Sequence, residues 1–277
     1  MTALGAVSHI DHGEGAPLLA LHGGMGGADQ AFLFAAALAP DLTRWRLIAP
    51  TRPAYGGARA TAPTLDAEAD RLASLLDQLG IGRITVAALS AGGPVAIAFA
   101  LRHAERCDRL LLASAITGRM TVRPDLLRGL RLGRLAARLP FIKSFLRRRL
   151  AADPARAVRR LAGDADLARR LLSDPEAFGL LHALEQSLLT RSVARIDGTS
   201  ADLHRIARLP PFQFEALAMP VLAIHGRADR VVPFDHAASL AARAPNARLL
   251  PIEHGRHLAL FTHLAEARSA ILPFLHG

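Results

Sequence analysis

The stretch Ile84-Thr85-Val86-Ala87-Ala88-Leu89-Ser90-Ala91-Gly92-Gly93-Pro94 decides the expected fold. It starts as an apolar run with β-branched side chains, which is typical of a buried strand. An alanine-rich segment, residues 91–104, follows directly and favours a helix. Ser90 therefore stands at a sharp strand-to-helix bend, where its hydroxyl projects from the end of a sheet toward the amides of the new helix. Small neighbours such as Ala88 and Gly92 suit that bend, because larger side chains would collide there.

Strand-like and helix-like segments alternate on both sides of this bend. Strands are expected at residues 5–10, 17–21, 45–49, 84–89, 109–113, 220–225 and 248–252, and helices at 28–38, 64–79, 235–243 and 264–275. Thr64 can cap the second of these helices, and Gly80 can end it. The alternation predicts an α/β fold in which helices wrap a mostly parallel, twisted sheet.

Residues 117–214 interrupt the alternation. Strand-like runs give way to leucine- and arginine-rich helical segments that are separated by prolines. This segment holds 19 Lys and Arg against 9 Asp and Glu, whereas the remaining residues hold 15 of each, so it carries the whole net charge of +10. We expect a helical cap inserted at 117–214 into one core, which residues 1–116 and 215–277 form.

Composition narrows the class of protein. Residues 1–20 lack a signal-peptide pattern and no apolar run reaches the ~18 residues of a membrane span, so we expect a cytoplasmic location. Cys107 is the single cysteine, which excludes an internal disulfide and a thiolate metal cluster. The twelve histidines are scattered without a His-Glu-x-x-His pattern, so we expect no metal. The basic segment has no aromatic interleaving or helix-turn-helix pattern, so we expect no nucleic-acid partner.

Two loops supply the groups that a nucleophilic serine needs. A serine hydroxyl requires a base to take its proton and a third group to orient that base. Asp229 follows the strand expected at 220–225, and His257 follows the one expected at 248–252. The carboxyl ends of parallel strands share one edge of a sheet, so Ser90, Asp229 and His257 can converge.

Each assignment has a rival. His254 and His263 flank His257, but the spacing from Gly255 favours His257. Ser114 also ends an expected strand, but it lacks the glycines that follow Ser90.

A glycine-rich loop, His22-Gly23-Gly24-Met25-Gly26-Gly27, follows an earlier strand. Attack on an ester carbonyl creates an oxyanion that needs two preorganised N–H donors. Ala91 supplies one, Gly24 is the best candidate for the other, and Met25 is the second choice. A phosphate-binding loop is the alternative, but the P-loop Lys-Ser/Thr and the dinucleotide-binding spacing are both missing.

Five motifs in this order resemble the α/β-hydrolase fold family. They are His22-Gly23-Gly24, Arg52-Pro53-Ala54-Tyr55-Gly56, the elbow at Ser90, Gly226-x-x-Asp229-x-x-Val232-Pro233 and Gly255-x-His257. One departure is plain, since Ala88 replaces the first glycine of the family pattern G-x-S-x-G. The resemblance implies a sheet of about eight strands and no cofactor. It also implies Ser90 as nucleophile, His257 as general base and then acid, and Asp229 as the residue that fixes the imidazole tautomer.

The expected function is a carboxylesterase that cleaves small or medium esters through an acyl-enzyme. Carbon-carbon bond hydrolase, lactonase and perhydrolase activities on the same triad stay open, as does a non-catalytic receptor of the same fold. A dehalogenase or epoxide hydrolase would carry aspartate in place of Ser90. Leucines of the cap favour an apolar small-molecule substrate, and its arginines leave an anionic one open. Contact of the basic cap with a membrane surface is a further alternative, and the oligomeric state is left open.

Overall fold

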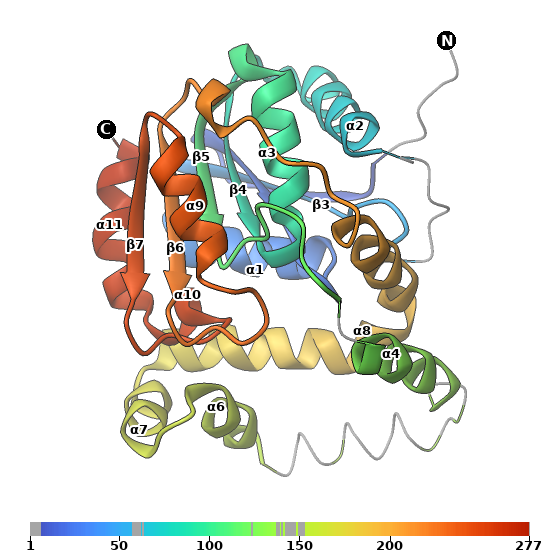
Figure 1. Ribbon diagram of the computed structural model, residues 1–277. Coiled ribbons are helices and arrows are strands. Elements are labelled where there is room, and N and C mark those ends of the chain that lie inside the picture. The colour runs from blue at the N-terminus through green and yellow to red at the C-terminus, as the bar shows by residue number, and fades with distance from the viewer. Residues whose placement is uncertain are drawn as a thin grey trace.

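A seven-stranded sheet forms the centre of the molecule (Figure 1). The computed structural model describes residues 7–56, 62, 64–122, 124–136, 139, 141, 148 and 153–276. The strands, in the order β1-β3-β2-β4-β5-β6-β7, are β1 (His9–His12), β3 (Trp45–Pro50), β2 (Ala16–Leu21), β4 (Ile84–Leu89), β5 (Cys107–Ala113), β6 (Val221–Gly226) and β7 (Ala247–Ile252). β1 pairs antiparallel with β3, and all other pairs are parallel. The predicted mostly parallel sheet is therefore confirmed.

The strand count differs from the family-derived expectation of about eight. Six strands match predicted segments to within two residues at either end, whereas β1 shares only residues 9 and 10 with the strand expected at 5–10. The described residues hold no further strand. The first strand starts at His9 instead of residue 5, and residues 5 and 6 lie outside the described part.

Five of the six core helices follow the predicted segments closely, and the short helix at residues 259–262 was not predicted. The six are α1 (Ala28–Leu38), α2 (Leu65–Gln78), α3 (Gly93–Arg102), α9 (Asp235–Arg243), α10 (Ala259–Thr262) and α11 (Leu264–His276), with short 3-10 turns η1 (Ser90–Gly92), η2 (Ala104–Arg106) and η3 (Phe214–Ala216). Thr64 caps α2 as predicted, because its Oγ1 accepts the Ala67 N–H at 3.1 Å.

Two apolar clusters cover the two faces of the sheet. Successive side chains of a strand point to opposite faces, and β4 shows the division. Ala87 and Leu89 pack in one cluster with α1, α10 and α11, whereas Val86 and Ala88 pack in the other with α2, α3 and α9. Because both faces are buried, the central strands are apolar along their whole length instead of alternating.

The segment after β5 is helical, as predicted. Its described helices are α4 (Pro124–Ala136), α6 (Ala155–Ala162), α7 (Ala165–Ser173) and α8 (Pro175–Ile206). Figure 1 shows the long helix α8 crossing the edge of the sheet at which the arrowheads of β6 and β7 end. The exact division into a core and a cap at residues 117 and 214 stays a prediction. Within the described residues, no helix is long and apolar enough to cross a membrane.

A buried ionic cluster fastens α8 to the core. The Arg52 guanidinium, which follows β3, donates two hydrogen bonds to Asp202 of α8 at 2.8 and 2.9 Å and a third to Glu68 of α2 at 2.9 Å. The Tyr55 hydroxyl also donates to Asp202, at 2.7 Å. Arg205 pairs with Glu68 at 2.9 Å, so two cations face two carboxylates. Charges removed from water need such complete pairing.

We expect Asp202→Ala to destabilise the fold by about 3–5 kcal/mol, because it leaves buried donors of Arg52 and Tyr55 without an acceptor. The free energy of unfolding in urea measures this loss. The control is Asp197→Ala on the same helix, which breaks an exposed pair with Arg134 and should change that free energy by less than about 1 kcal/mol. Equal effects of the two substitutions would contradict a fastening role for the cluster.

Candidate active site

The bend that carries Ser90 has a strained backbone. Ser90 has a φ of +52°, a region that residues with side chains rarely adopt. A β-carbon on Gly93 would lie 2.4 Å from the Ile116 carbonyl oxygen, so the start of α3 tolerates no side chain there. Ala88 is fully buried among apolar side chains on the α2 and α3 face of the sheet. This face accommodates the alanine that replaces the first glycine of the family pattern.

Ser90, His257 and Asp229 form a continuous chain of hydrogen bonds. The Ser90 Oγ lies 3.0 Å from His257 Nε2, and His257 Nδ1 lies 2.8 Å from Asp229 Oδ2. An ionised carboxylate only accepts hydrogen bonds, so Nδ1 carries the imidazole proton and Nε2 is left to accept from the serine hydroxyl. The arrangement can withdraw a proton from Ser90.

Close packing of two loops brings Asp229 and His257 together. A β-carbon on Gly226, the last residue of β6, would lie 2.1 Å from the Gly255 carbonyl oxygen. That same oxygen accepts the Ala228 N–H at 3.0 Å. The loops after β6 and β7 therefore touch only with glycine at position 226, and a β-carbon on Gly255 would lie 2.7 Å from the Ala259 Cβ and from the Ile252 Cγ2.

The Asp229 carboxylate has more donors than the sequence predicted. Its Oδ1 accepts the N–H groups of Val231 and Val232 at 2.7 and 3.0 Å. The buried His225 Nε2 lies 3.3 Å from Oδ2 while it donates to the Val232 carbonyl at 3.0 Å. Burial alone would raise the pKa of Asp229, but the hydrogen bonds from His225 and His257 outweigh it and hold that pKa well below its usual range. The sequence held no signal for this donor, because His225 stands at the end of the strand expected at 220–225.

The rival residues lie elsewhere. His254 is exposed, and the His263 Nδ1 contacts the Thr262 hydroxyl at 3.0 Å. Ser114 follows β5 directly and has a φ of +43°. Within the described part of the chain, His257 is the histidine that is hydrogen-bonded to Ser90.

The glycine-rich loop packs against the nucleophile. A β-carbon on Gly23 would lie 2.8 Å from the Ser90 Cβ. His22 is fully buried and supports the loop, since its Nδ1 donates to the Gly23 carbonyl at 2.8 Å and its Nε2 accepts the Arg52 N–H at 3.1 Å. Burial and the nearby Arg52 charge lower the pKa of His22 to about 3, so the ring is neutral at ordinary pH.

Hydrogen bonding distinguishes the two amides of the loop, those of Gly24 and Met25, that could bind the oxyanion. The Met25 N–H donates to the Thr199 Oγ1 at 2.8 Å, whereas the Gly24 N–H has no acceptor among the described residues. Ala91 lies in the first turn of η1, where helical amides lack an intrahelical acceptor. Gly24 and Ala91 are thus the amides left for a ligand. The sequence held no signal for Thr199, which is 174 residues from Met25.

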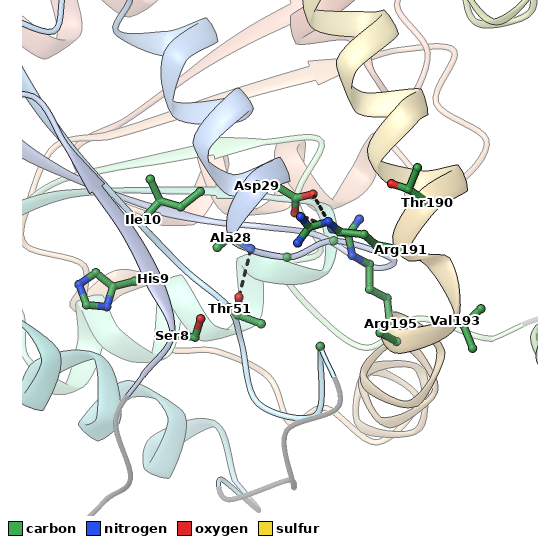
Figure 2. Close-up of a pocket in the computed structure, with 14 residues that line it drawn as sticks. Ser8, His9, Ile10, Ala28, Asp29, Thr51, Thr190, Arg191, Val193 and Arg195 are labelled. Atoms are coloured by element: carbon green, nitrogen blue, oxygen red, sulfur yellow. Dashed lines mark hydrogen bonds and ion pairs between the residues drawn. The ribbon is translucent and has the colours of Figure 1, made fainter. Parts of the chain in front are cut away.

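Gly26 and Gly27 of this loop help to line a cavity of about 510 Å³ (Figure 2). Its wall includes His9 of β1, Asp29 of α1, and Arg191 and Arg195 of α8. None of Ser90, Asp229 and His257 lines it, so it is separate from the candidate active site. In the described residues, no group of three or more His, Cys, Asp or Glu side chains could hold a metal ion.

Comparisons with known proteins identify the fold family of the chain. A sequence model of the alpha/beta hydrolase fold family matches residues 16–264. The chain is 30% identical over 234 residues to a pimeloyl-[acyl-carrier protein] methyl ester esterase of Aromatoleum aromaticum, covering 84% of this chain and 88% of that protein. It is 28% identical over 273 residues to a 2-hydroxymuconate semialdehyde hydrolase of Pseudomonas putida, covering 93% of this chain and 90% of that protein. An alpha/beta hydrolase fold protein from Nakamurella multipartita matches in structure with a TM-score of 0.81 at 24% sequence identity. The match covers 99% of this chain and 96% of that protein, which shows that the two share a fold.

The low pKa of His22 predicts a pH-dependent stability. Between pH 6.5 and about 3 the unfolded chain binds a proton at this position and the folded chain does not, so stability falls as the pH falls. We expect His22→Gln to reduce that dependence by up to about 1.4 kcal/mol per pH unit. Urea unfolding of both proteins from pH 7 to pH 4 measures the difference, and the exposed His254→Gln serves as the control. Parallel curves for wild type and His22→Gln would show that His22 does not titrate in this way.

Proposed function

Because the chain belongs to the alpha/beta hydrolase fold family, we propose that it is a serine hydrolase and, within that class, a carboxylesterase that works through an acyl-enzyme. Both curated relatives named above are hydrolases. The observation that carries the proposal is the unbroken chain of hydrogen bonds from Ser90 through His257 to Asp229. A capping serine would have no reason to lie 3.0 Å from an imidazole that a buried carboxylate orients.

Acylation begins when the Ser90 Oγ attacks the ester carbonyl and His257 Nε2 takes the hydroxyl proton. Asp229 stabilises the imidazolium that forms, because its carboxylate is held ionised by its own donors. The carbonyl oxygen becomes an oxyanion, which accepts hydrogen bonds from the Gly24 and Ala91 amides. Collapse of this intermediate breaks the ester C–O bond, and His257 returns the proton to the leaving alcohol.

Deacylation repeats these roles with water. His257 takes a proton from a water molecule, which attacks the acyl carbonyl, and the same two amides bind the second oxyanion. The intermediate then breaks its bond to the Ser90 Oγ, which recovers its proton from His257. The products are a carboxylate and the free enzyme, and the cycle needs no cofactor.

The surroundings of Ser90 favour an apolar, uncharged substrate. Ala91 packs with Ile116, Ile206 and Val232 in a small apolar cluster next to the nucleophile. Among the cap arginines whose side chains are described, all are exposed except Arg195 and Arg205. Both of these are already ion-paired, so neither is left to neutralise an anionic substrate.

Carbon-carbon bond hydrolysis is the second candidate. It is favoured by the relative from Pseudomonas putida, whose name states hydrolysis of 2-hydroxymuconate semialdehyde. The same serine and amides suit attack on a ketone carbonyl. Turnover of a panel of esters, lactones and vinylogous diketones, with hydrogen peroxide as an alternative acceptor, ranks these activities and tests lactonase and perhydrolase chemistry together.

We expect Ser90→Ala to lower kcat/KM for p-nitrophenyl butyrate by at least about 10⁴-fold, since it removes the nucleophile of the triad. Ser114→Ala is the matched control, because Ser114 also follows a strand directly and has a positive φ. It should stay within about threefold of wild type. A fluorophosphonate probe should label Ser90 and no other residue.

Two results would count against the proposal. Equal turnover by Ser90→Ala and wild type would remove Ser90 from the chemistry. A folded wild type without turnover on the whole panel and without a fluorophosphonate adduct would favour the non-catalytic receptor.

A further inference from the structure

We propose that Thr199 and Arg195 of α8 are positioning residues for the oxyanion donor in the glycine-rich loop. The inference rests on the proposed function, because it concerns the Gly24 amide assigned there. Both polar groups of the Met25 backbone are bound by this one helix, and the bonds come from outside the sheet that carries the nucleophile.

Met25 needs this support because its backbone is strained. Its φ is +56°, in the left-handed region that residues with a β-carbon rarely adopt. The Met25 N–H donates to Thr199 Oγ1 at 2.8 Å, and the Met25 carbonyl accepts from Arg195 Nη1 at 3.1 Å. Arg195 and Thr199 are four residues apart and lie on one face of the helix. One face of α8 thus binds both the N–H and the carbonyl of Met25 and stabilises its left-handed backbone conformation.

The direction of the Thr199 hydroxyl suits this role. Its hydrogen is donated to the Arg195 carbonyl at 2.8 Å, so its oxygen faces Met25 as an acceptor. The residue is 8% exposed, and its Cγ2 lies 3.5 Å from the position that a β-carbon on Gly24 would take. Thr199 therefore contacts Gly24 and binds the residue after it.

Arg195 is held equally firmly. Its Nη1 also donates to the Ser187 hydroxyl at 2.8 Å, and its Nη2 donates to Asp29 at the start of α1. The Ser187 hydroxyl completes the group by donating to Asp29 at 2.9 Å. Figure 2 shows Arg195 and Asp29 meeting between α8 and α1. This pairing connects the positioning helix to the element that follows the glycine-rich loop.

The consequence concerns which amide binds the oxyanion. With its N–H bonded to Thr199, Met25 has no donor to offer. The N–H of Gly24, which follows the Gly23 that packs against Ser90, has no acceptor among the described residues. The helix α8 thereby selects the donor and sets its position, in addition to covering the edge of the sheet. Loss of the Thr199 acceptor would leave a half-buried N–H unpaired and turn the Met25 peptide away from this geometry.

The test compares Thr199→Val, which keeps the shape and loses the acceptor, with Thr199→Ser, which keeps the hydroxyl. We expect Thr199→Val to lower kcat for p-nitrophenyl butyrate by about ten- to a hundredfold with KM within about twofold, because a displaced oxyanion donor weakens the transition state. Affinity for butylboronic acid, which forms a tetrahedral adduct on serine, should fall by the same factor. The pH midpoint of kcat should not move, and Thr199→Ser should stay within about threefold of wild type. Thermal unfolding verifies that both variants are folded.

Each contrary result has a distinct meaning. Wild-type kcat and boronate affinity in Thr199→Val would overturn the inference and leave the proposed function intact. An equal loss in Thr199→Ser would also overturn it, since the effect would then come from packing of the methyl group. A wild type with neither ester turnover nor a fluorophosphonate adduct would overturn both the inference and the proposed function.

Discussion

The hydrogen bond between the Asp229 carboxylate and the His257 imidazole depends on almost every level of the structure. It requires β6 and β7 to run parallel and in register, so that their following loops leave the sheet at the same edge. It also requires glycine at position 226, where a β-carbon would lie 2.1 Å from the Gly255 carbonyl oxygen of the following loop. A buried carboxylate would tend to take up a proton, and the surrounding donors prevent this. The imidazole therefore meets a charged partner and presents its unprotonated nitrogen to Ser90.

The second dependence is on α8. This helix contributes Asp202 to the buried ionic cluster with Arg52, and it contributes Thr199 and Arg195 to the glycine-rich loop. The charged pairing and the loop contacts lie within eight residues of one another along the helix, so fastening α8 to the core also sets the geometry beside Ser90. An inserted segment that merely roofed the pocket would not need buried ion pairs with two separate core elements. Burying those charges costs free energy even when they are paired, and these pairs lie where they fix the position of α8 relative to the site.

The two regions of the chain therefore differ in their physical character. The core depends on apolar strands that are covered on both faces, and its helices supply the covering layers. The contact of α8 with the glycine-rich loop and the start of α1 consists of hydrogen bonds and ion pairs that have defined directions, whereas Ile206 at the end of α8 makes apolar contact with Ala91. Directional contacts specify geometry more strictly than apolar packing does, which suits a loop whose amides must be held in one arrangement.

Local patterns in the sequence determined a large part of this description. Apolar runs predicted six of the seven strands closely and the first only in part, and Thr64 marked the start of α2. The spacing of Ser90, Asp229 and His257 relative to strand ends predicted their convergence, because parallel strands deliver the loops after them to one edge.

The tertiary structure alone decided the contacts between distant segments. The pairing of Arg52 with Asp202 and of Met25 with Thr199 spans 150 and 174 residues. Nothing in the local pattern of a helix shows which of its polar residues will meet a given backbone group. His225 likewise reads as the end of a strand, and only its approach to Asp229 shows it as a donor. Sequence alone thus determined the order of elements and the chemical groups of the site, because both follow from local periodicity and motif spacing. Their mutual orientation follows from long-range packing, which only the folded chain contains.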